Sequence, residues 1–341
     1  MSAAEPFRSR WKRRVRTIPL MLAVTAAGVL ASPIMLIGGV AFDLAQRRFR
    51  LPTARMTLFL LQYAINDSVE IALAPVLWVR AGFGRRLHQP ASMQRHQRLQ
   101  QWSLEVLARR AQHLLGVQLE IDPESAGALT PGPVIVLCRH VSVLDASLPS
   151  LLYQQRGYRT RGVIMAELLA DPGFDLIYAR TGSVFITRDH GPDALARLRD
   201  LAVGVDSVTA MVIFPEGRLF RPEVLTRAMG RLRDTNPERA ERLAGLSTVL
   251  PPRPGGVLAL LDALPQTDVV FLAHAGLDRF SSFRELARAV PLRDPLPIGA
   301  WRVAAADIPA ADQDRIAWLD HQWLGMQHWV TQHTRPEAPP R

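Results

Sequence analysis

A long run of uncharged residues near the amino terminus limits the possible folds of this chain more than any other feature. Residues Ile18 to Phe42 contain no Asp, Glu, Lys, Arg or His and are mostly Leu, Ile, Val, Ala, Gly and Met. A helix needs roughly 20 such residues to cross the hydrocarbon core of a bilayer, so this run is long enough to span one. A cleaved signal peptide fits poorly, because its apolar core is shorter and a basic cluster follows this run closely. We therefore expect a retained membrane anchor.

A second apolar segment, Leu58 to Val79, is interrupted by Asn66, Asp67 and Glu70. A charged residue at the bilayer centre costs about 2.5–3.5 kcal/mol, whereas a large apolar residue contributes only about 0.3–0.6 kcal/mol. Full insertion is therefore marginal unless these polar groups pair or face protein. Two arrangements stay open, a two-helix hairpin and a single span followed by an interfacial helix. We favour the hairpin, which leaves both ends on the cytosolic side of the membrane.

The composition narrows the class of protein. Hydrophobic residues make up 48% of the chain and the formal net charge is +10, nearly all of it from arginine. Such a surplus suits anionic lipid headgroups, phosphorylated substrates or nucleic acid. Lys12 is the only lysine, so a Walker Gly-Lys-Ser/Thr motif is excluded. Cys138 is the only cysteine, which excludes an intrachain disulfide and a cysteine-based zinc site. The arginines are scattered and no nucleic-acid-binding signature occurs, so we expect no nucleic-acid partner.

Short apolar runs alternate with amphipathic segments after Pro131-Gly132. The expected strands are 133–138, 161–165, 183–187, 208–214, 267–275 and 298–304. The expected helices include 145–155, 192–203, 236–245, 255–264 and 312–333. This alternation predicts an α/β domain with a mostly parallel sheet flanked by helices. Three tryptophans in the last segment indicate a docking or membrane-interface helix.

His140 and Asp145 follow the first of these strands. On one continuous helix, residues five apart lie about 140° from each other and cannot meet. If His140 lies in the strand-to-helix turn and Asp145 in the first helical turn, the carboxylate can reach an imidazole nitrogen. It would then fix the tautomer and leave the other nitrogen free to take a proton. The alternative is a surface histidine beside a helix-capping aspartate.

Two further motifs lie at the ends of strands. The segment 182–188, Gly-Ser-Val-Phe-Ile-Thr-Arg, ends in Arg188, whose planar fork suits phosphate oxygens. The segment 211–218, Met-Val-Ile-Phe-Pro-Glu-Gly-Arg, brings Glu216 and Gly217 into a turn. Gly217 permits close backbone approach, and Glu216 can accept hydrogen bonds from a hydroxylated acceptor. A salt-bridged surface arginine and a plain Pro-x-Gly turn are the alternatives.

In their order along the chain, these motifs resemble those of the glycerolipid acyltransferase superfamily, typified by 1-acylglycerol-3-phosphate acyltransferase. The matching blocks are His-x4-Asp, Gly-x-x-Phe-Ile-x-Arg and Phe-Pro-Glu-Gly. Residues 250–256, Leu-Pro-Pro-Arg-Pro-Gly-Gly, resemble the Pro-Arg/Lys-x-x-Gly block of the lysocardiolipin acyltransferase-like branch. Asp307-Ile308-Pro309 and Trp318-Leu319 resemble the terminal segment of that branch, so the likeness runs from about residue 130 to 320.

The chain departs from the family pattern at two places. The third block usually reads Glu-Gly-Thr-Arg, whereas Arg218-Leu219 follows Gly217 here, and Arg218 or Arg221 would take the place of the usual arginine. Arg139 precedes the histidine where asparagine is common. These changes bear on the identity of the acceptor more than on the type of reaction.

The resemblance implies an integral membrane enzyme whose catalytic domain faces the cytosol. It would move a fatty acyl group from acyl-CoA or acyl-carrier protein to the free hydroxyl of a lysophospholipid, above all 1-acyl-sn-glycerol-3-phosphate, and give phosphatidate. No metal or other cofactor is expected. His140 would act as general base and Asp145 would orient it. The substrate-binding residues would be Arg188, Phe214, Pro215, Glu216, Gly217, Arg218 and Arg253.

The expected organisation is a set of membrane-anchoring helices in residues 1–90, an acyltransferase domain in 91–330 and a flexible Pro-rich tail in 331–341. Two other functions stay open, an acyltransferase acting on another lysophospholipid and a relative that has lost catalysis and binds lipids. The Arg218-Leu219 pair favours the second of these, and the intact His140/Asp145 pair argues against it. Ser142 as an acyl-enzyme nucleophile is disfavoured, because no Gly-x-Ser-x-Gly elbow surrounds it.

Overall fold

The computed structural model describes residues 7–130, 132–142, 144–187, 193–280 and 283–334. The chain forms two compact units that are interleaved along the sequence. Unit 1 consists of Met1–Val117, Arg159–Leu201 and Ala287–Asp294. Unit 2 consists of Gln118–Tyr158, Ala202–Leu286 and Pro295–Arg341.

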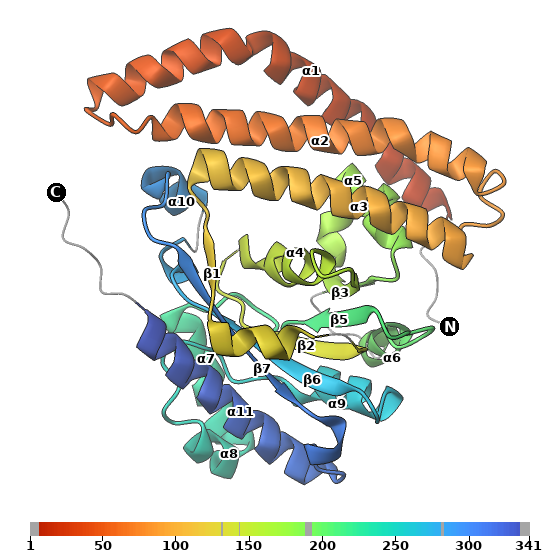
Figure 1. The fold of residues 1–341 in the computed structure, drawn as a ribbon, viewed down its shortest axis with the longest axis vertical. Helices are drawn as coiled ribbons and strands as arrows, with labels where there is room; N and C mark the ends of the chain where they lie inside the picture. Colours follow the sequence, from red (N-terminus) through yellow and green to blue (C-terminus); the bar gives the residue numbers. More distant parts are fainter. Residues whose placement is uncertain (1–6, 131, 143, 188–192, 281–282, 335–341) are drawn as a thin grey trace. The chain divides into compact units, whose positions relative to one another are not determined.

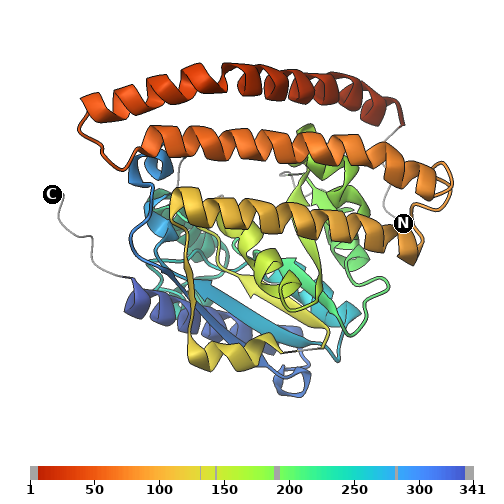
Figure 2. The same cartoon turned by 45° about the horizontal axis from the view of Figure 1, so that its top comes forward.

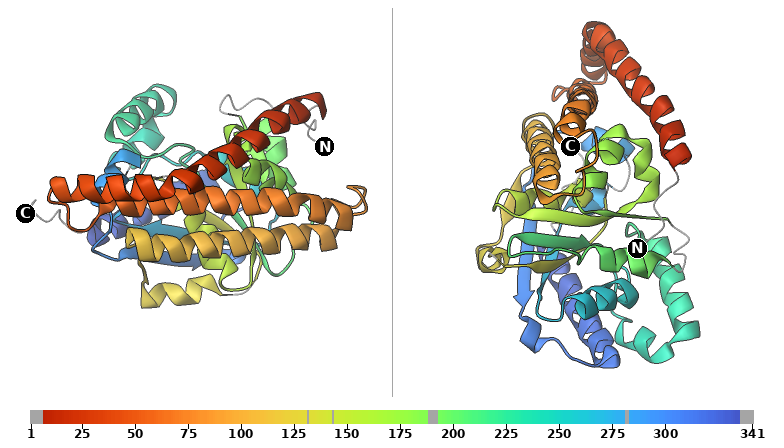
Figure 3. Two further views of the ribbon diagram at one scale, coloured as in Figure 1. Left: turned by 90° about the horizontal axis from the view of Figure 1, so that it is seen from above. Right: turned by 90° about the vertical axis from the view of Figure 1, so that its right-hand side faces the viewer.

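Three long helices of unit 1 lie side by side, α1 (Phe7–Ala45), α2 (Pro52–Arg80) and α3 (Pro90–Arg110) (Figures 1 and 2). The buried carboxylate of Asp43, near the end of α1, accepts hydrogen bonds from the Thr53 backbone N–H at 2.9 Å and the Thr53 hydroxyl at 2.7 Å. It thereby caps the first turn of α2, whose backbone N–H groups have no partner within the helix. From this turn α1 follows α2 and then diverges toward its own amino terminus (Figure 3).

Among the described residues, α1 is the one helix long and apolar enough to cross a bilayer by length and composition. Its apolar side chains are largely exposed, Leu30 at 81% for example. In α2 the polar residues face protein instead. Asn66 donates from Nδ2 to the Ser103 carbonyl at 3.0 Å, and Asp67 and Glu70 are buried. The polar interruption of the segment 58–79 is thus accounted for by packing within unit 1.

The remaining elements of unit 1 are short. They are β3 (Arg159–Met165), β4 (Val184–Ile186), α5 (Pro172–Leu176) and α6 (Asp193–Asp200). Strands β3 and β4 pair in parallel. Arg14 binds Asp175 of α5 at 2.7 Å, which ties the amino-terminal part of α1 to this region. Helix α10 (Phe283–Ala289) contains residues of both units.

Unit 2 is built on five strands in the spatial order β1-β7-β6-β2-β5. Their bounds are β1 (Leu119–Ile121), β2 (Val134–Cys138), β5 (Thr209–Ile213), β6 (Asp268–His274) and β7 (Leu296–Val303). All neighbours in this order are parallel except β6 and β7, which are antiparallel. Every residue of β2 and β5 is buried, as expected for central strands covered on both faces.

Helices cover both faces of this sheet. Helix α4 (Leu148–Gln154) lies on one face, and α9 (Pro254–Ala263) and α11 (Asp312–His333) lie on the other (Figure 1). Leu148 and Leu152 of α4 join the core with Val134 and Val136 of β2. The unit is completed by α7 (Pro222–Thr235) and α8 (Pro237–Arg242).

The expected fold class, a mostly parallel sheet flanked by helices with an amino-terminal apolar helix, is confirmed. The short strand β1 and the helix α7 were not expected from the sequence. Helix α11 has the predicted bounds, 312–333, but it is a core helix. Trp323 is fully buried, and its indole nitrogen donates to the Leu250 carbonyl at 2.8 Å.

A buried ion pair between α8 and α11 gives a stability prediction. Arg239 donates to Asp320 at 2.7–3.0 Å and to the Pro252 carbonyl at 2.7 Å, and Asp320 is only 1% exposed. Replacing Arg239 by alanine leaves a poorly compensated buried charge, so we expect the free energy of unfolding to fall by about 3–5 kcal/mol. Denaturant unfolding in detergent measures this. Arg242→Ala removes only the outer, half-exposed partner of Asp320, and an equal loss in both variants would contradict the prediction.

Candidate active site

The carboxyl ends of β2, β5 and β6 meet at one edge of the sheet of unit 2, because these strands are parallel neighbours. His140 follows β2, the segment 214–217 follows β5, and His274 ends β6. The register that pairs Leu137 with Ile213 carries His140 to the level of Glu216. In open α/β sheets this edge is where ligands are bound.

His140 and Asp145 are joined at this edge. The ring nitrogen Nδ1 of His140 lies 2.6 Å from Oδ1 of Asp145. Asp145 lies in a single 3-10 turn, Leu144–Ser147, which precedes α4, so the strand–turn–helix arrangement predicted from the spacing is observed. The His140 side chain is 21% exposed and Asp145 is fully buried. The imidazole therefore joins a buried acid to a solvent-accessible surface, and its Nε2 forms no hydrogen bond with the described residues.

The second oxygen of Asp145 is held by the turn itself. Oδ2 accepts from the backbone N–H groups of Val141 at 2.6 Å and Ser142 at 2.8 Å. Burial by itself would raise the pKa of Asp145, but its hydrogen bonds to His140 and His274 outweigh burial and keep that pKa below the ordinary range. Asp145 is thus a charged, immobile partner for the imidazole.

Glu216 holds the backbone around His140 in place. Glu216 is 2% exposed, and its carboxyl group accepts from the His140 backbone N–H at 3.0 Å and the Leu250 backbone N–H at 2.8 Å. In this arrangement Glu216 fixes the backbone that carries His140. The expected contact of Glu216 with substrate stays a prediction.

The protonation of Glu216 gives a pH prediction. Burial raises its pKa from 4.5 to about 8, against the two backbone hydrogen bonds and Arg139, which lower it. Between these values the folded protein keeps a proton that the unfolded chain has released, so stability is lost as pH rises from about 4.5 to about 8. Glu216→Gln cannot titrate. We expect its thermal midpoint to fall less between pH 5 and pH 8 than that of the wild type, and equal falls would contradict this.

Gly217 and Arg218 follow on the exposed side of the same turn, and Arg253, from a later segment, lies beside Gly217. Gly217 has a φ of +65° and lies against the Arg253 guanidinium, about 3.3 Å from the position a Cβ would take, so glycine is required here. Partial desolvation, and then the like charges of Arg218 and Arg231, lower the pKa of Arg253. The predicted residues Gly217, Arg218 and Arg253 are thus brought together into a basic surface.

Phe214 and Pro215 have structural contacts. The Phe214 ring packs on the His140 ring with centroids 4.5 Å apart, and Pro215 is buried with its carbonyl accepting from the Arg253 backbone N–H at 2.8 Å. Arg188 lies outside the described residues.

The hydroxyl of Ser142 donates to the Phe280 carbonyl at 2.8 Å, which fits a structural role. Cys138 is buried, and burial raises the pKa of its thiol.

The supporting roles of two residues, Arg139 and His274, were not predicted from the sequence. Arg139 is fully buried and donates to Asp278, to the Thr248 carbonyl at 2.7 Å and to the His274 carbonyl at 2.9 Å. His274 is fully buried beside Asp145, with Nε2 3.5 Å from Oδ2. The one available signal was that His274, like His140, lies at the end of an apolar strand.

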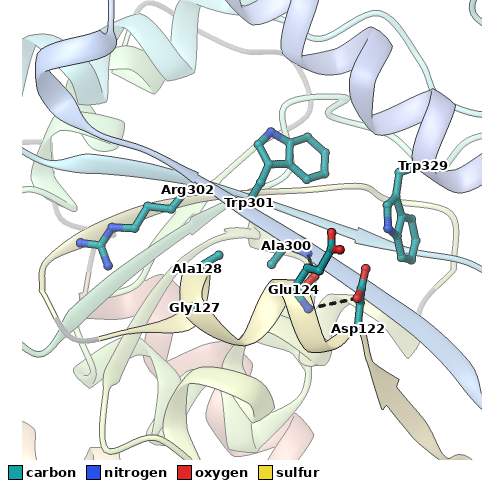
Figure 4. A pocket seen from close by; sticks show the side chains of 9 residues that line it. Asp122, Glu124, Gly127, Ala128, Ala300, Trp301, Arg302 and Trp329 are labelled. Atoms are coloured by element: carbon teal, nitrogen blue, oxygen red, sulfur yellow. Dashed lines mark hydrogen bonds between the residues drawn. The ribbon is translucent and has the colours of Figure 1, made fainter.

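The pocket shown in Figure 4 lies elsewhere in unit 2. It has a volume of about 470 Å³ and is lined by residues of the segment 122–128, of β7 and by Trp329, and neither His140 nor Asp145 belongs to it. Over the part of the chain that the structure describes, no group of three or more His, Cys, Asp or Glu side chains is placed to hold a metal ion.

The fold and the site define an α/β protein in which a buried aspartate orients a partly exposed histidine, an arrangement suited to general-base chemistry. Residues 122–288 match the protein-family model described as Acyltransferase. The chain therefore carries a domain of the acyltransferase family, and the family expected from the motifs is confirmed at this level.

The chain also resembles a solved structure, at low sequence identity. The crystal structure of the 1-acyl-sn-glycerophosphate (LPA) acyltransferase PlsC from Thermotoga maritima is similar with a TM-score of 0.48 and 14% sequence identity, covering 83% of this chain and 100% of that chain. None of the curated proteins matches this chain in sequence.

Proposed function

We propose that this acyltransferase is membrane-bound and transfers a fatty acyl group from acyl-CoA or acyl-carrier protein to the free hydroxyl of 1-acyl-sn-glycerol-3-phosphate, giving phosphatidate. The observation that carries the proposal is the His140–Asp145 pair, with 2.6 Å between Nδ1 and Oδ1, inside the region that matches the family.

The geometry of His140 supports its role as the base. Nδ1 faces a carboxylate, so it carries a proton, and Nε2 is left to accept one from the lipid hydroxyl. The hydroxyl oxygen attacks the thioester carbonyl carbon, the carbon–sulfur bond breaks, and the imidazolium returns the proton to the departing thiolate. Asp145 stays charged and stabilises the imidazolium while it exists.

Arg218 and Arg253 support a phosphorylated acceptor. Both lie beside Gly217, which directly follows Glu216, the residue that binds the His140 backbone N–H, and the two guanidinium groups repel each other. A phosphate group would relieve this repulsion and accept charge-assisted hydrogen bonds from them. We propose that they hold the acceptor phosphate; the substrate-binding role expected of Arg188 stays a prediction from the sequence, because Arg188 lies outside the described residues.

We also propose that α1 anchors the protein in the bilayer with the catalytic domain on the cytosolic face. The helix is 39 residues long, or about 58 Å at 1.5 Å per residue, which exceeds the roughly 30 Å of the hydrocarbon core. Its exposed apolar side chains would be unfavourable in water and stable in lipid.

The test of the reaction is a competition between acceptors. The full-length protein in vesicles is given lysophosphatidate, lysophosphatidylcholine and lysophosphatidylglycerol together, with acyl-CoA as donor in one assay and acyl-carrier protein carrying the same acyl chain in a second, and the products are identified by mass spectrometry. We expect phosphatidate to dominate. Another diacyl product would identify another acceptor, and the absence of every diacyl product with either donor would leave a lipid-binding relative without catalysis.

Arg218→Gln tests the phosphate contact. Losing a hydrogen bond to a charged group is worth about 1.5 kcal/mol or more, so we expect KM for lysophosphatidate to rise about tenfold with kcat nearly unchanged. Arg227→Gln, on the exposed surface of α7, serves as the matched control for loss of charge. Equal KM values in the two variants would exclude Arg218 from the acceptor site.

A further inference from the structure

A second histidine lies on the far side of the Asp145 carboxylate. His274, at the end of β6, is fully buried and cannot contact a substrate. Its Nε2 lies 3.5 Å from Oδ2 of Asp145 and 3.2 Å from the Arg139 carbonyl oxygen. Both neighbours are acceptors, so Nε2 carries a proton directed between them. Its Nδ1 has no hydrogen-bond partner among the described residues. An apolar side chain of similar size would avoid this orphaned nitrogen, yet a histidine occupies the position.

Asp145 divides its two oxygens between different partners. Oδ2 faces three N–H groups, those of Val141, Ser142 and His274, whereas Oδ1 faces only the ring of His140. The negative charge of the carboxylate is thus drawn toward Oδ2. Each donor on Oδ2 weakens the attraction that Oδ1 exerts on the proton of His140.

We infer that His274 is a positioning residue that acts through Asp145: its N–H to Oδ2 moderates the pull of the carboxylate on the imidazolium, so that His140 releases its proton more readily and returns to the form that acts as a base. This inference rests on the proposed role of His140. The lowered pKa of Asp145, to which the His274 hydrogen bond contributes after burial and the His140 hydrogen bond, agrees with it.

The other charged and titratable groups near this set are already engaged. Arg139 pairs with Asp278, and Glu216 accepts from the backbone N–H groups of His140 and Leu250. Cys138 is buried on β2 behind the site. The two backbone donors to Oδ2 remain when His274 is replaced, so Asp145 stays in place and the expected effect is electrostatic.

The test follows the chemical modification of His140, which needs no substrate. Diethyl pyrocarbonate attacks the uncharged imidazole, and the rate at His140 is measured against pH by peptide mass spectrometry on the full-length protein in detergent. His274→Met removes the donor, and we expect the midpoint of the pH profile to rise by about one unit, the equivalent of one hydrogen bond to a charged group. In acyl transfer, kcat below that midpoint should fall up to about tenfold with KM unchanged.

Three further variants separate positioning from packing. His274→Gln places an amide N–H near the position of Nε2 and should restore the wild-type midpoint. His274→Asn places its amide too far back to reach Asp145, so it should behave like His274→Met and replaces that variant if methionine prevents folding. Cys138→Ala alters packing beside the same strand and should leave the midpoint unchanged. A midpoint that stays or falls in both His274→Met and His274→Asn overturns the inference.

The experiments distinguish an error in the proposed reaction from an error in the role inferred for His274. If the wild type transfers no acyl group but the midpoint rises in His274→Met, the proposed reaction is wrong and the action of His274 on His140 stands. If the wild type is active and the midpoint is insensitive to His274, the reaction stands and the inference is wrong.

Discussion

His140→Ala lowers the turnover of acyl transfer by about 10²–10⁴-fold, the usual contribution of a positioned general base. The loss should fall on kcat, because the imidazole acts when the proton leaves the attacking hydroxyl. Folding should survive, since His140 is tied to its neighbours by its backbone. The N–H donates to Glu216 at 3.0 Å and the carbonyl accepts from Phe220 at 2.8 Å, and alanine keeps both bonds.

The measurement is single-turnover acyl transfer in membranes at matched protein levels. His321→Ala is the control, because His321 is an exposed histidine of α11 in the same unit and should lose no activity. Near-normal turnover in His140→Ala would remove His140 as the base. Unfolding of the variant is excluded separately by comparing its thermal midpoint with that of His321→Ala.

Local patterns predicted the strands and the pairing of His140 with Asp145. The central strands β2, β5 and β6 are buried apolar runs, and β2 was expected at 133–138 and found at Val134–Cys138. The pairing followed from the geometry of a turn, which depends only on residues five apart. The sequence pattern could not show that Asp145 lies in a 3-10 turn rather than in the helix proper, because both place the carboxylate near the ring.

The support of the site could not be predicted, because it joins residues far apart in the sequence. Arg139 looked like a departure from the family pattern on the substrate side, yet it is buried and pairs with Asp278, 139 residues further on. Glu216 was expected to bind the acceptor, because a carboxylate can accept hydrogen bonds from a hydroxyl group. Its contact with the His140 backbone depends on the alignment of β2 with β5, which the local sequence does not show.

Asp145→Asn is expected to reduce turnover about as severely as removal of His140, although only one atom changes. The reason lies in the two backbone N–H groups, from Val141 at 2.6 Å and Ser142 at 2.8 Å, which both point at Oδ2. An amide NH2 group cannot occupy that position, because donors would face donors. The asparagine must therefore place its oxygen there and direct its NH2 group at His140.

That orientation gives His140 the wrong tautomer. Nδ1 must now accept a hydrogen bond, so the ring proton moves to Nε2, the atom that has to take a proton from the lipid hydroxyl. The same substitution in a serine-protease triad lowers kcat about 10⁴-fold for this reason, and we expect a loss of about 10³–10⁴-fold here with KM little changed. Asp278→Asn is the control, because Asp278 binds Arg139 and is 27% exposed, and it should lose less than tenfold. If Asp145→Asn kept a tenth of the wild-type turnover while folded, the carboxylate would not be setting the tautomer, and His140 could not be the base in the manner proposed.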